Sequence, residues 1–599
     1  MGGDAGLDAP DEGQTFYGSS SAHDFTRQMY GSVLQNDVAS PTSGPTEATS
    51  STQPVANSRS PYVSTENFSL LPRDLADRLM HLYWERVHVL YPFLHKPSFS
   101  QAYEDLWRPV SEHHPQNRAG LGLGASRDSG PSSVIFHCAL NAVLALGVQF
   151  SDLPLNEKER LSASCLSKSK DLLRLDLFDN GDIALVQTLL LLTQYFQSTN
   201  WPNKCWTTIG LACRLAQGLG LHVEEDRVDQ QIDVAVREIR RRAWHGCVTL
   251  DIIVSMTLGR PAMLIGSTTR SIPAPIDGDS ELVLQDSNEG PISSIEFFGE
   301  TVKLYRIIGR ILLSIYKIND GHSERVAAAA DETKTREGIV IGFDEDLTRF
   351  EADLPKGLYW KSSDLQSRET TGILARQSHV LHVRFLHARI LLHRPGFLQF
   401  CRVHKESGDA NRLVDGGLAH TALDSSLTCA RTAVELITSV SQYSATEATG
   451  AWWYNVFYTR TAAMVVLLSG VCPPIREHIG DDAWEEAWRR CVAILTKNLP
   501  QYAPVRSCLT TLTALRDNVL RERNESASRG DAPKQVAGTQ VPAARRPSSS
   551  SPRNPRRSEV AASSMHNERL LDATFDPFEF VESDLFFADF GIDFEEPFM

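Results

Sequence analysis

The sequence predicts an all-α fold, in which disordered N- and C-terminal flanks surround one large multi-helix body. Apolar residues recur at helical spacing from Leu70 to about Arg523, and no run alternates strictly between apolar and polar residues. Both ends are instead rich in Ser, Gly and Pro, and such segments bury too little apolar surface to offset chain entropy. A chain of 599 residues leaves ample length for a sizeable core.

Composition favours a folded body in a reducing compartment. The net charge is −15, which does not favour direct nucleic-acid contact but leaves room for a local basic face. The ten cysteines are spread singly without a C-x-x-C pair, which argues against a disulfide framework and against cysteine-based zinc sites. We expect no signal peptide and no membrane association, because the longest apolar stretch, Val134–Val148, is shorter than a membrane span.

The chain divides into four regions by composition. Residues 1–65 form the N-terminal flank, which we expect to be disordered, and residues 66–525 form the helical body. The body opens with an apolar helical pattern that starts near Pro72 and that Pro92 ends or kinks.

Three clear helical patterns follow in the middle of the body. The first covers Asp182–Thr199, and a Trp-Pro-Asn break separates it from the second. Asn203 is the expected N-cap of the second helix, and Gly218 or Gly220 its expected stop. The third pattern runs over residues 235–259 and opens with consecutive arginines.

The last two regions differ sharply in charge. Residues 526–570 form a disordered Ser/Pro/Arg linker whose paired arginines suggest a nuclear-import signal, or else a solvated spacer. These arginines are Arg545, Arg546, Arg553, Arg556 and Arg557. Residues 571–599 carry nine acids and no Lys or Arg, with eight phenylalanines between them.

The acidic tail has the composition of an amphipathic activation segment. Charge repulsion keeps such a chain solvated, so its rings stay available for an apolar groove with a basic rim on a partner. We expect Phe586, Phe587 and Phe590 to do the docking, with a coactivator or the general transcription machinery as partner. The alternative is a tail that packs its phenylalanines back onto the body.

Four blocks in order resemble the middle homology region of fungal-specific transcription factors, the regulatory domain that usually accompanies a binuclear zinc cluster. The blocks are His81–Phe99, Leu185–His222, Arg237–Leu264 and His387–Phe397. The resemblance spans residues 66–525 and implies an all-α regulatory domain in a nuclear protein. It also implies a set of signature positions, which are His95, Pro97, Trp206, Arg240, Arg241, Arg242, Trp244, Asp251, Gly259, Arg260 and Pro261.

The residues themselves favour structural roles for this signature. At least one of the three consecutive arginines should meet a carboxylate while the others stay in water, and Asp251 is a candidate partner for Arg260. His95 is expected to be packed or hydrogen-bonded rather than a ligand. His245 stands where the family often has a second Trp, and its ring can still fill that site.

The six-cysteine zinc cluster that commonly begins such proteins has no counterpart in this sequence, whose first cysteine is Cys138. Either a cysteine-bearing exon lies outside the sequence, or the protein reaches DNA through a DNA-binding partner. Direct DNA binding therefore stays open, as does a homodimer.

The signals that could indicate an enzyme are incomplete, so we expect no enzyme, catalytic residue, metal or cofactor. The glycine-rich stretch Gly120–Ser126 lacks the strand that should precede a phosphate loop. Four histidines crowd one helical stretch without an acidic third ligand, namely His379, His382, His387 and His393.

The sequence thus favours a nuclear transcription regulator, which we expect to be an activator of a specific fungal gene set such as a secondary-metabolite biosynthetic cluster. The alternative is a helical metabolite-binding sensor or adaptor that does not bind chromatin.

Overall fold

The computed structural model describes most of the body and a small part of the N-terminal flank. The described residues are 25–26, 28, 70–113, 118, 120–173, 181–199, 201–223, 233–266, 271–274, 283–284, 292–316, 329–361, 372–407, 417–444, 446, 448–498 and 504–530. Within them the fold is all-α, as the sequence predicts, apart from one antiparallel pair of two-residue strands, β1 (Val283–Leu284) and β2 (Ile292–Ser293).

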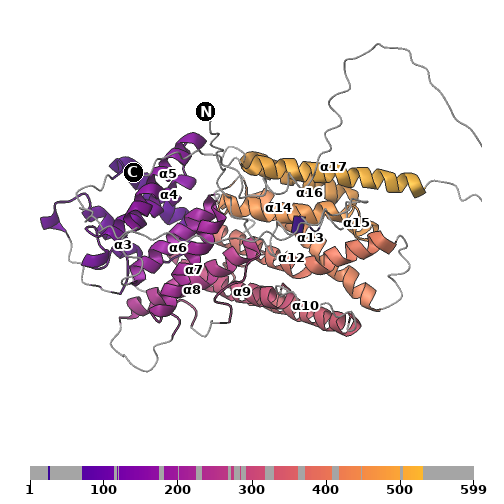
Figure 1. Ribbon diagram of the computed structural model, residues 1–599, viewed down its shortest axis with the longest axis horizontal. Coiled ribbons are helices and arrows are strands. Elements are labelled where there is room, and N and C mark those ends of the chain that lie inside the picture. The colour runs from indigo at the N-terminus through magenta and orange to yellow at the C-terminus, as the bar shows by residue number, and fades with distance from the viewer. Residues whose placement is uncertain are drawn as a thin grey trace, which may run out of the picture.

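The N-terminal half of the body consists of helices α2 to α8 (Figure 1). A π-helical turn, Trp84–His88, and two short 3-10 turns, Val110–Glu112 and Arg127–Ser129, interrupt the series. The helices are α2 (Arg73–Tyr83), α3 (Lys96–Asp105), α4 (Val134–Gln149), α5 (Leu155–Leu173), α6 (Ile183–Ser198), α7 (Pro202–Gly218) and α8 (Val234–Leu258). Neighbours in the chain pack together, as α4 does on α5 and α6 on α7.

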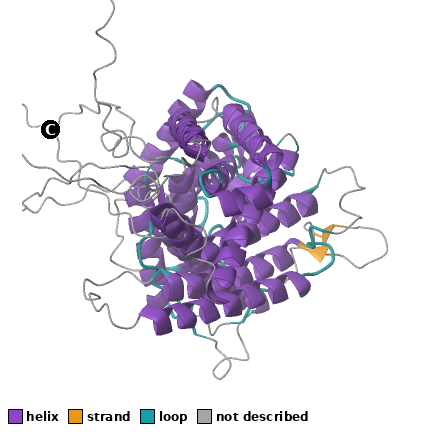
Figure 2. Ribbon diagram, turned by 90° about the vertical axis from the view of Figure 1, so that its right-hand side faces the viewer, coloured by secondary structure: helices purple, strands orange, loops and turns teal. Residues whose placement is uncertain are grey.

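The C-terminal half lies beside the first in Figure 1 and is joined to it through α9 and α12. Helix α9 (Ser294–Ile315) packs on α8, on α10 (Ala329–Ala352) and on α12 (Ile373–Ser407). The remaining helices are α13 (Gly417–Tyr443), α14 (Trp452–Ser469), α15 (Pro473–Ile479), α16 (Asp481–Asn498) and α17 (Pro504–Gly530). Figure 2 shows the helices gathered into one body, with the strand pair at its edge.

One continuous hydrophobic core runs through both halves. Helix α6 is buried on nearly its whole circumference, because its sequence is apolar on every face. Asp182 begins it, since its side chain accepts a hydrogen bond from the backbone N–H of Leu185 at 2.9 Å. All ten cysteines are buried and free.

Several predicted boundaries shift by a few residues. Helix α7 begins at Pro202 with Trp201 before it, so Asn203 is not the N-cap, whereas the stop at Gly218 is confirmed. Helix α17 continues to Gly530, past the predicted end of the body at residue 525. No single described helix is long and apolar enough to cross a membrane. Helices α14 and α15, which meet at 113°, pass that test only when taken together.

Candidate functional site

His95 closes the first signature block as a helix cap. Its Nδ1 lies 2.7 Å from Ser98 Oγ and accepts from the backbone N–H of Ser98 at 3.4 Å, at the first turn of α3. Pro97 stands in that same turn, where its missing N–H costs nothing. The structure therefore gives His95 and Pro97 the task of starting α3, whereas the sequence pattern indicated only the close of the preceding helix.

The three consecutive arginines of α8 are held by local partners. Arg242 is 1% exposed, and its Nε donates to Glu238 Oε1 at 3.4 Å. Arg241 Nη1 lies 3.7 Å from the other carboxylate oxygen of Glu238, and Arg240 Nη2 donates to the Leu219 carbonyl at 3.1 Å. Burial raises the pKa of Glu238, and the charge of Arg242 opposes that rise. The prediction that an arginine of this run meets a carboxylate is confirmed.

The C-terminal end of α8 is fixed by Asp251, though not through the predicted arginine. Asp251 Oδ2 accepts from the backbone N–H groups of Met263 and Leu264 at 2.7 and 2.9 Å. Arg260 instead donates to Asn203 Oδ1 at 2.8 Å, so the predicted Asp251–Arg260 pair is wrong. A carboxylate can satisfy two N–H groups of a turn at once, which the sequence pattern did not reveal.

The Gly-Arg-Pro turn follows from backbone conformation and stacking. Gly259 ends α8 with φ at +67°, a conformation that other residues adopt only with strain. Pro261 follows and cannot continue a helix. The Arg260 guanidinium lies 5.4 Å from the centre of the Trp206 ring.

Two rings in the middle of α8 fill the core. Trp244 and His245 are both fully buried, and His245 Nε2 lies 2.9 Å from the Ser271 carbonyl oxygen. The His245 ring is therefore packed in the core and has a hydrogen-bonding partner.

The glycine-rich loop, residues 120–126, packs against α6 and forms a hydrogen bond with its Gln187 side chain. Gly120, Gly122 and Gly124 all have positive φ angles. A Cβ at Gly122 would lie 2.0 Å from Gln187 Oε1, so only glycine fits beneath this side chain. Gln187 accepts from the Leu123 N–H at 2.9 Å and donates to the Phe93 carbonyl at 2.8 Å. The loop thus turns its backbone toward a glutamine of the core.

The histidines of α12 pack among aromatic rings. His379 lies against Tyr443, His382 stacks on Trp360, and His387 lies against Tyr458. Burial lowers the pKa of His379 and of His387 to about 3, so both rings are neutral near pH 7.

His393 belongs to a polar group at the surface of α12. Its ring lies 3.3 Å from the Asp344 carboxylate, which also accepts two hydrogen bonds from Arg389. Burial would raise the pKa of Asp344, but these partners outweigh it and lower the pKa to about 2. Among the described residues, no group of three His, Cys, Asp or Glu side chains is arranged to hold a metal ion.

A fully buried arginine, Arg384 of α12, has no counterpart among the residues that the sequence pattern singled out. Its Nη2 donates to the Tyr91 hydroxyl at 2.7 Å and its Nη1 to Thr301 Oγ1 at 3.1 Å. Its guanidinium also lies 5.3 to 5.7 Å from the ring centres of Tyr91, Phe297 and Tyr305. The available signal was a cation on the apolar face of a long helix, flanked at helical spacing by Leu381 and Ala388.

A chain of hydroxyl groups leads from this arginine to the contact between the halves. The Tyr91 hydroxyl donates to the Tyr454 hydroxyl at 3.4 Å, which donates to Gln197 Oε1 at 2.7 Å. Burial raises the pKa of Tyr454 well above its ordinary value, so this hydroxyl stays protonated. The chain links α12 to α14 and α6, and so couples both halves through polar groups.

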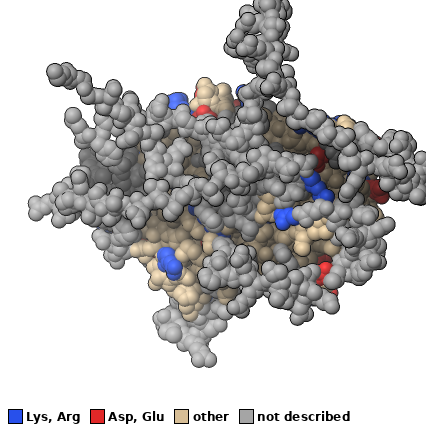
Figure 3. Space-filling model, turned by 45° about the vertical axis from the view of Figure 1, so that its right-hand side comes forward, with Lys and Arg blue, Asp and Glu red and all other residues tan. Residues whose placement is uncertain are grey.

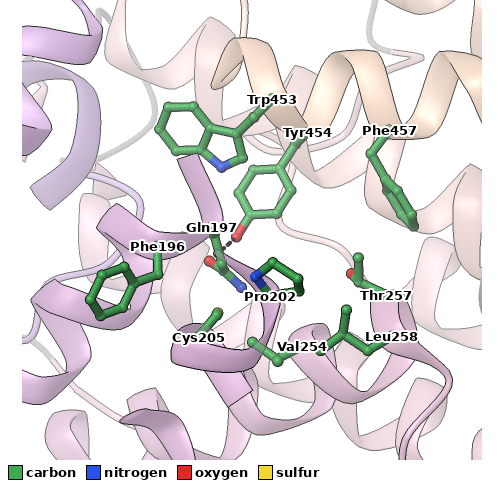
Figure 4. Close-up of a pocket in the computed structure, with 10 residues that line it drawn as sticks. All are labelled: Phe196, Gln197, Pro202, Cys205, Val254, Thr257, Leu258, Trp453, Tyr454 and Phe457. Atoms are coloured by element: carbon green, nitrogen blue, oxygen red, sulfur yellow. Dashed lines mark hydrogen bonds between the residues drawn. The ribbon is translucent and has the colours of Figure 1, made fainter. Parts of the chain in front are cut away.

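The end of the chain of hydroxyl groups borders a pocket between the two halves (Figure 4). Its cavity volume is about 40 Å³, and the wider hollow of about 470 Å³ includes open solvent. Its walls come from α14 on one side and from α6, α7 and α8 on the other. The lining residues are Phe196, Gln197, Pro202, Cys205, Val254, Thr257, Leu258, Trp453, Tyr454 and Phe457.

The pocket is apolar with one polar edge. None of its ten lining residues carries a charge, and four of them are aromatic. Thr257 donates to the Ile253 carbonyl at 2.8 Å, so its hydroxyl proton is already used. Gln197 Oε1 is taken by Tyr454, and its amide Nε2 makes no hydrogen bond with the described residues. This amide therefore leaves a hydrogen-bond donor at the edge of the pocket.

Charged side chains on the visible surface are mixed in sign. On the face shown in Figure 3, the Lys and Arg side chains that the structure describes are interspersed with Asp and Glu. Nucleic-acid binding surfaces typically gather basic residues into a stripe or patch. The linker arginines and the tail phenylalanines lie outside the described residues, so the structure does not address the import signal or the activation segment.

With this geometry in place, the chain can be compared with known proteins. Residues 80–345 match the fungal specific transcription factor domain. This range includes the first three of the four resembling blocks, so the match agrees with the resemblance found in their order.

Several similar proteins are also fungal transcription factors. Sorbicillinoid biosynthetic cluster transcription factor 2 of Penicillium rubens is 25% identical over 461 residues, covering 74% of this chain and 61% of that protein. Sorbicillinoid biosynthetic cluster transcription factor sor3 of Hypocrea jecorina is 24% identical, over 76% of this chain and 61% of its own length. Transcription factor FBD3 of Gibberella moniliformis is 25% identical, over 75% and 59%. The chain therefore spans about three fifths of the length of these relatives. All are transcription factors, a class that is generally not enzymatic.

Among solved structures, the K. lactis CBF3 core aligns with a TM-score of 0.42 at 12% identity, over 76% of this chain and 83% of that one.

Proposed function

We propose that this protein is a nuclear transcription regulator that activates a specific set of fungal genes. The observation that carries the proposal is the fungal specific transcription factor domain at residues 80–345, together with relatives that are transcription factors over three quarters of this chain. The names of two relatives refer to a biosynthetic gene cluster, which supports a secondary-metabolite cluster as the kind of target.

The regions of the chain would divide this work. The helical body is the regulatory and dimerising part, the arginines of residues 545–557 direct nuclear import, and the acidic tail recruits coactivators. DNA contact comes through a DNA-binding partner, or through a zinc cluster that lies outside this sequence. The mixed charge on the visible face of the body fits either route, because neither needs the body itself to hold phosphates.

Transcript sequencing after deletion of the gene tests the proposed activity. We expect a limited set of transcripts to fall and to recover when the wild-type gene is restored. Recovery should fail with a variant in which Phe586, Phe587 and Phe590 are all replaced by Ala, since the rings make the partner contact. A matched variant with Phe16, Tyr17 and Tyr30 replaced by Ala controls for loss of aromatic residues in a flank. An unchanged transcript profile after deletion would contradict the proposal.

Import by the linker has its own test. Replacing the five linker arginines by Ala should move a fluorescent fusion of the full chain from the nucleus to the cytosol, whereas replacement by Lys should not, because import signals depend on charge. If the alanine variant stays nuclear, the linker is only a spacer.

The pocket favours a second candidate function, a sensor of a small metabolite. Its uncharged aromatic walls and the Gln197 amide fit a neutral, largely apolar molecule with one carbonyl group. A guest there would touch both halves at once, because the walls come from α6 to α8 and from α14. In this function the body would bind its metabolite without acting at promoters.

Three simple probes of similar size test the pocket in the full chain. Acetophenone supplies the ring and the carbonyl, ethylbenzene lacks the carbonyl, and benzoate carries a charge. We expect acetophenone to raise the melting temperature more than either of the others. Gln197→Leu should abolish the advantage over ethylbenzene, whereas the surface change Gln217→Leu should preserve it. Equal effects of acetophenone and ethylbenzene on the wild-type chain would refute the assigned role of Gln197.

A further inference from the structure

A short piece of the N-terminal flank lies inside the C-terminal half of the body. Phe25, Thr26 and Gln28 are helical, and Phe25 and Thr26 are each only 1% exposed. Phe25 is part of the main hydrophobic core, although the next described residue after Gln28 is Leu70. In Figure 1 this piece is the short indigo segment among the helices of the C-terminal half. Composition alone assigned this stretch to a disordered flank, so its burial needs a specific cause.

The ring of Phe25 packs on a buried cation. The Arg394 guanidinium lies 4.7 Å from the centre of the Phe25 ring and 5.4 Å from that of Tyr316. Arg394 is 2% exposed, so this contact is shielded from water and is stronger than a surface one.

A proline in α12 helps to build this contact. Pro395 lacks the N–H that would bond to the Leu391 carbonyl four residues earlier. The Tyr316 hydroxyl donates to that carbonyl at 2.7 Å, which holds the Tyr316 ring beside Arg394. Residues of the body therefore position Arg394 and Tyr316, the two side chains around the Phe25 ring.

Thr26 is bound by a second arginine. Its Oγ1 donates to Met464 Sδ at 3.0 Å and accepts from Arg460 Nη2 at 3.4 Å. Arg460 is 3% exposed and Met464 is 1% exposed, and both lie on α14. Two successive residues of the flank thus meet two buried arginines on two different helices.

We propose that the space between α12 and α14 is a peptide-binding groove for a short helical Phe-Thr segment, and that Phe25 and Thr26 of the same chain occupy it. The groove combines an apolar seat with two guanidinium groups, which suits an aromatic ring followed by a hydroxyl. Binding within one chain closes the loop of residues 29–69, whose closure entropy grows only slowly with length. A short contact can therefore hold the N-terminal flank against the C-terminal half.

Limited trypsin digestion of the full chain tests this docking. Trypsin can cleave after Arg27, which stands between Thr26 and Gln28 in the sequence, and after Arg59, which stands elsewhere in the same flank. We expect Phe25→Ala to speed cleavage after Arg27 by about tenfold or more, because a buried ring is lost and the segment is released. Cleavage after Arg59 should stay within about twofold of the wild-type rate. The matched variant Phe16→Ala should change neither rate. Equal cleavage after Arg27 in wild type and Phe25→Ala would overturn the proposal.

A milder variant distinguishes release of the docked segment from a general loss of folding. Thr26→Val keeps the size of the side chain but removes the contacts with Met464 and Arg460, so it should speed the same cleavage by roughly threefold. A fluorescein-labelled peptide of residues 20–32 adds a direct readout by anisotropy. It should bind the full-length Phe25→Ala chain, whose groove is vacant, at least about tenfold more tightly than the wild-type chain. Equal binding to both chains, or to neither, would also overturn the proposal.

Discussion

Two buried arginines, Arg242 in the N-terminal half and Arg384 in the C-terminal half, meet the cost of burial in different ways. Arg242 lies beside the carboxylate of Glu238, four residues earlier on the same helix. Arg384 has hydroxyl groups and aromatic rings around it, contributed by distant parts of the chain. A local ion pair fixes one helix, whereas the hydroxyl chain from Arg384 through Tyr91 to Tyr454 and Gln197 links several.

Stability and coupling therefore depend on different groups in the two regions. Around Arg242 each charge is matched nearby, so changes there should alter the free energy of unfolding without reaching the pocket. Around Tyr454 the same group supports the core and borders the pocket, so changes there should affect stability and ligand binding together. Three measurements of unfolding free energy test whether the two regions differ in this way.

Arg242→Met should have the largest effect. It leaves the Glu238 carboxylate, which is 2% exposed, with Arg241 and the Ala274 N–H as its remaining partners. Because breaking a buried pair typically costs about 3–5 kcal/mol, we expect a loss near the lower end of that range. Urea denaturation measures this loss. The double variant Glu238→Gln/Arg242→Met should recover much of it, because the buried charge is then gone. Arg240 is only partly buried, so Arg240→Met is the comparison variant. If both variants lower the free energy of unfolding equally, burial of the Arg242–Glu238 pair makes no special contribution to stability.

Acid sensitivity should come next in size. In the unfolded chain His379 takes up a proton near pH 6.5, but burial lowers its pKa to about 3 in the folded protein. The unfolded state therefore binds more protons as the pH falls from 6.5 toward 3, and the folded state loses stability over that range. Between pH 7 and pH 5 this amounts to about 2 kcal/mol for His379. His387 contributes in the same direction.

The histidine contribution can be isolated. His379→Phe should reduce the loss of unfolding free energy between pH 7 and pH 5 by about 2 kcal/mol. The exposed change His478→Phe should leave that loss unaltered. Asp251 acts in the opposite direction, because burial raises its pKa to about 6 and its protonation stabilises the fold as the pH drops below that value. An unchanged pH dependence in His379→Phe would contradict the buried neutral ring.

Tyr454→Phe should have the smallest effect on stability and the clearest effect on coupling. It interrupts the hydroxyl chain and leaves Gln197 Oε1 without its donor, at a cost of about 1–2 kcal/mol by urea denaturation. It should also change the thermal shift caused by acetophenone, which Arg242→Met should not. Tyr359→Phe, at a partly buried tyrosine away from the pocket, serves as the matched control. If Arg242→Met alters ligand binding as strongly, the two regions are not separate in function.

The sequence predicted the parts of the fold that depend on local pattern. Apolar periodicity located α6 and α8, and Gly259 marked the end of α8, because these depend on neighbours within a few residues. The sequence also predicted that one of the three consecutive arginines meets a carboxylate, although it named neither Arg242 nor its partner Glu238 one turn away.

The contacts that the sequence did not predict join residues that are far apart in the chain. Tyr91 and Arg384 form one polar cluster although they are far apart in the chain, and no periodicity connects them. Asp251 was paired with the wrong group, because a carboxylate can bond to backbone N–H groups that no side-chain pattern reveals. Phe25 lies in a polar stretch whose composition conceals a single buried ring.

The most direct test of the central proposal is chromatin crosslinking of the protein, tagged at its C-terminus at the native locus, followed by sequencing of the bound DNA. We expect sharp peaks at the promoters of the genes whose transcripts fall on deletion. A short motif shared by those peaks would point to a DNA-binding partner or a zinc cluster outside this sequence. A flat profile under both inducing and non-inducing conditions would contradict a role at promoters and favour the metabolite sensor.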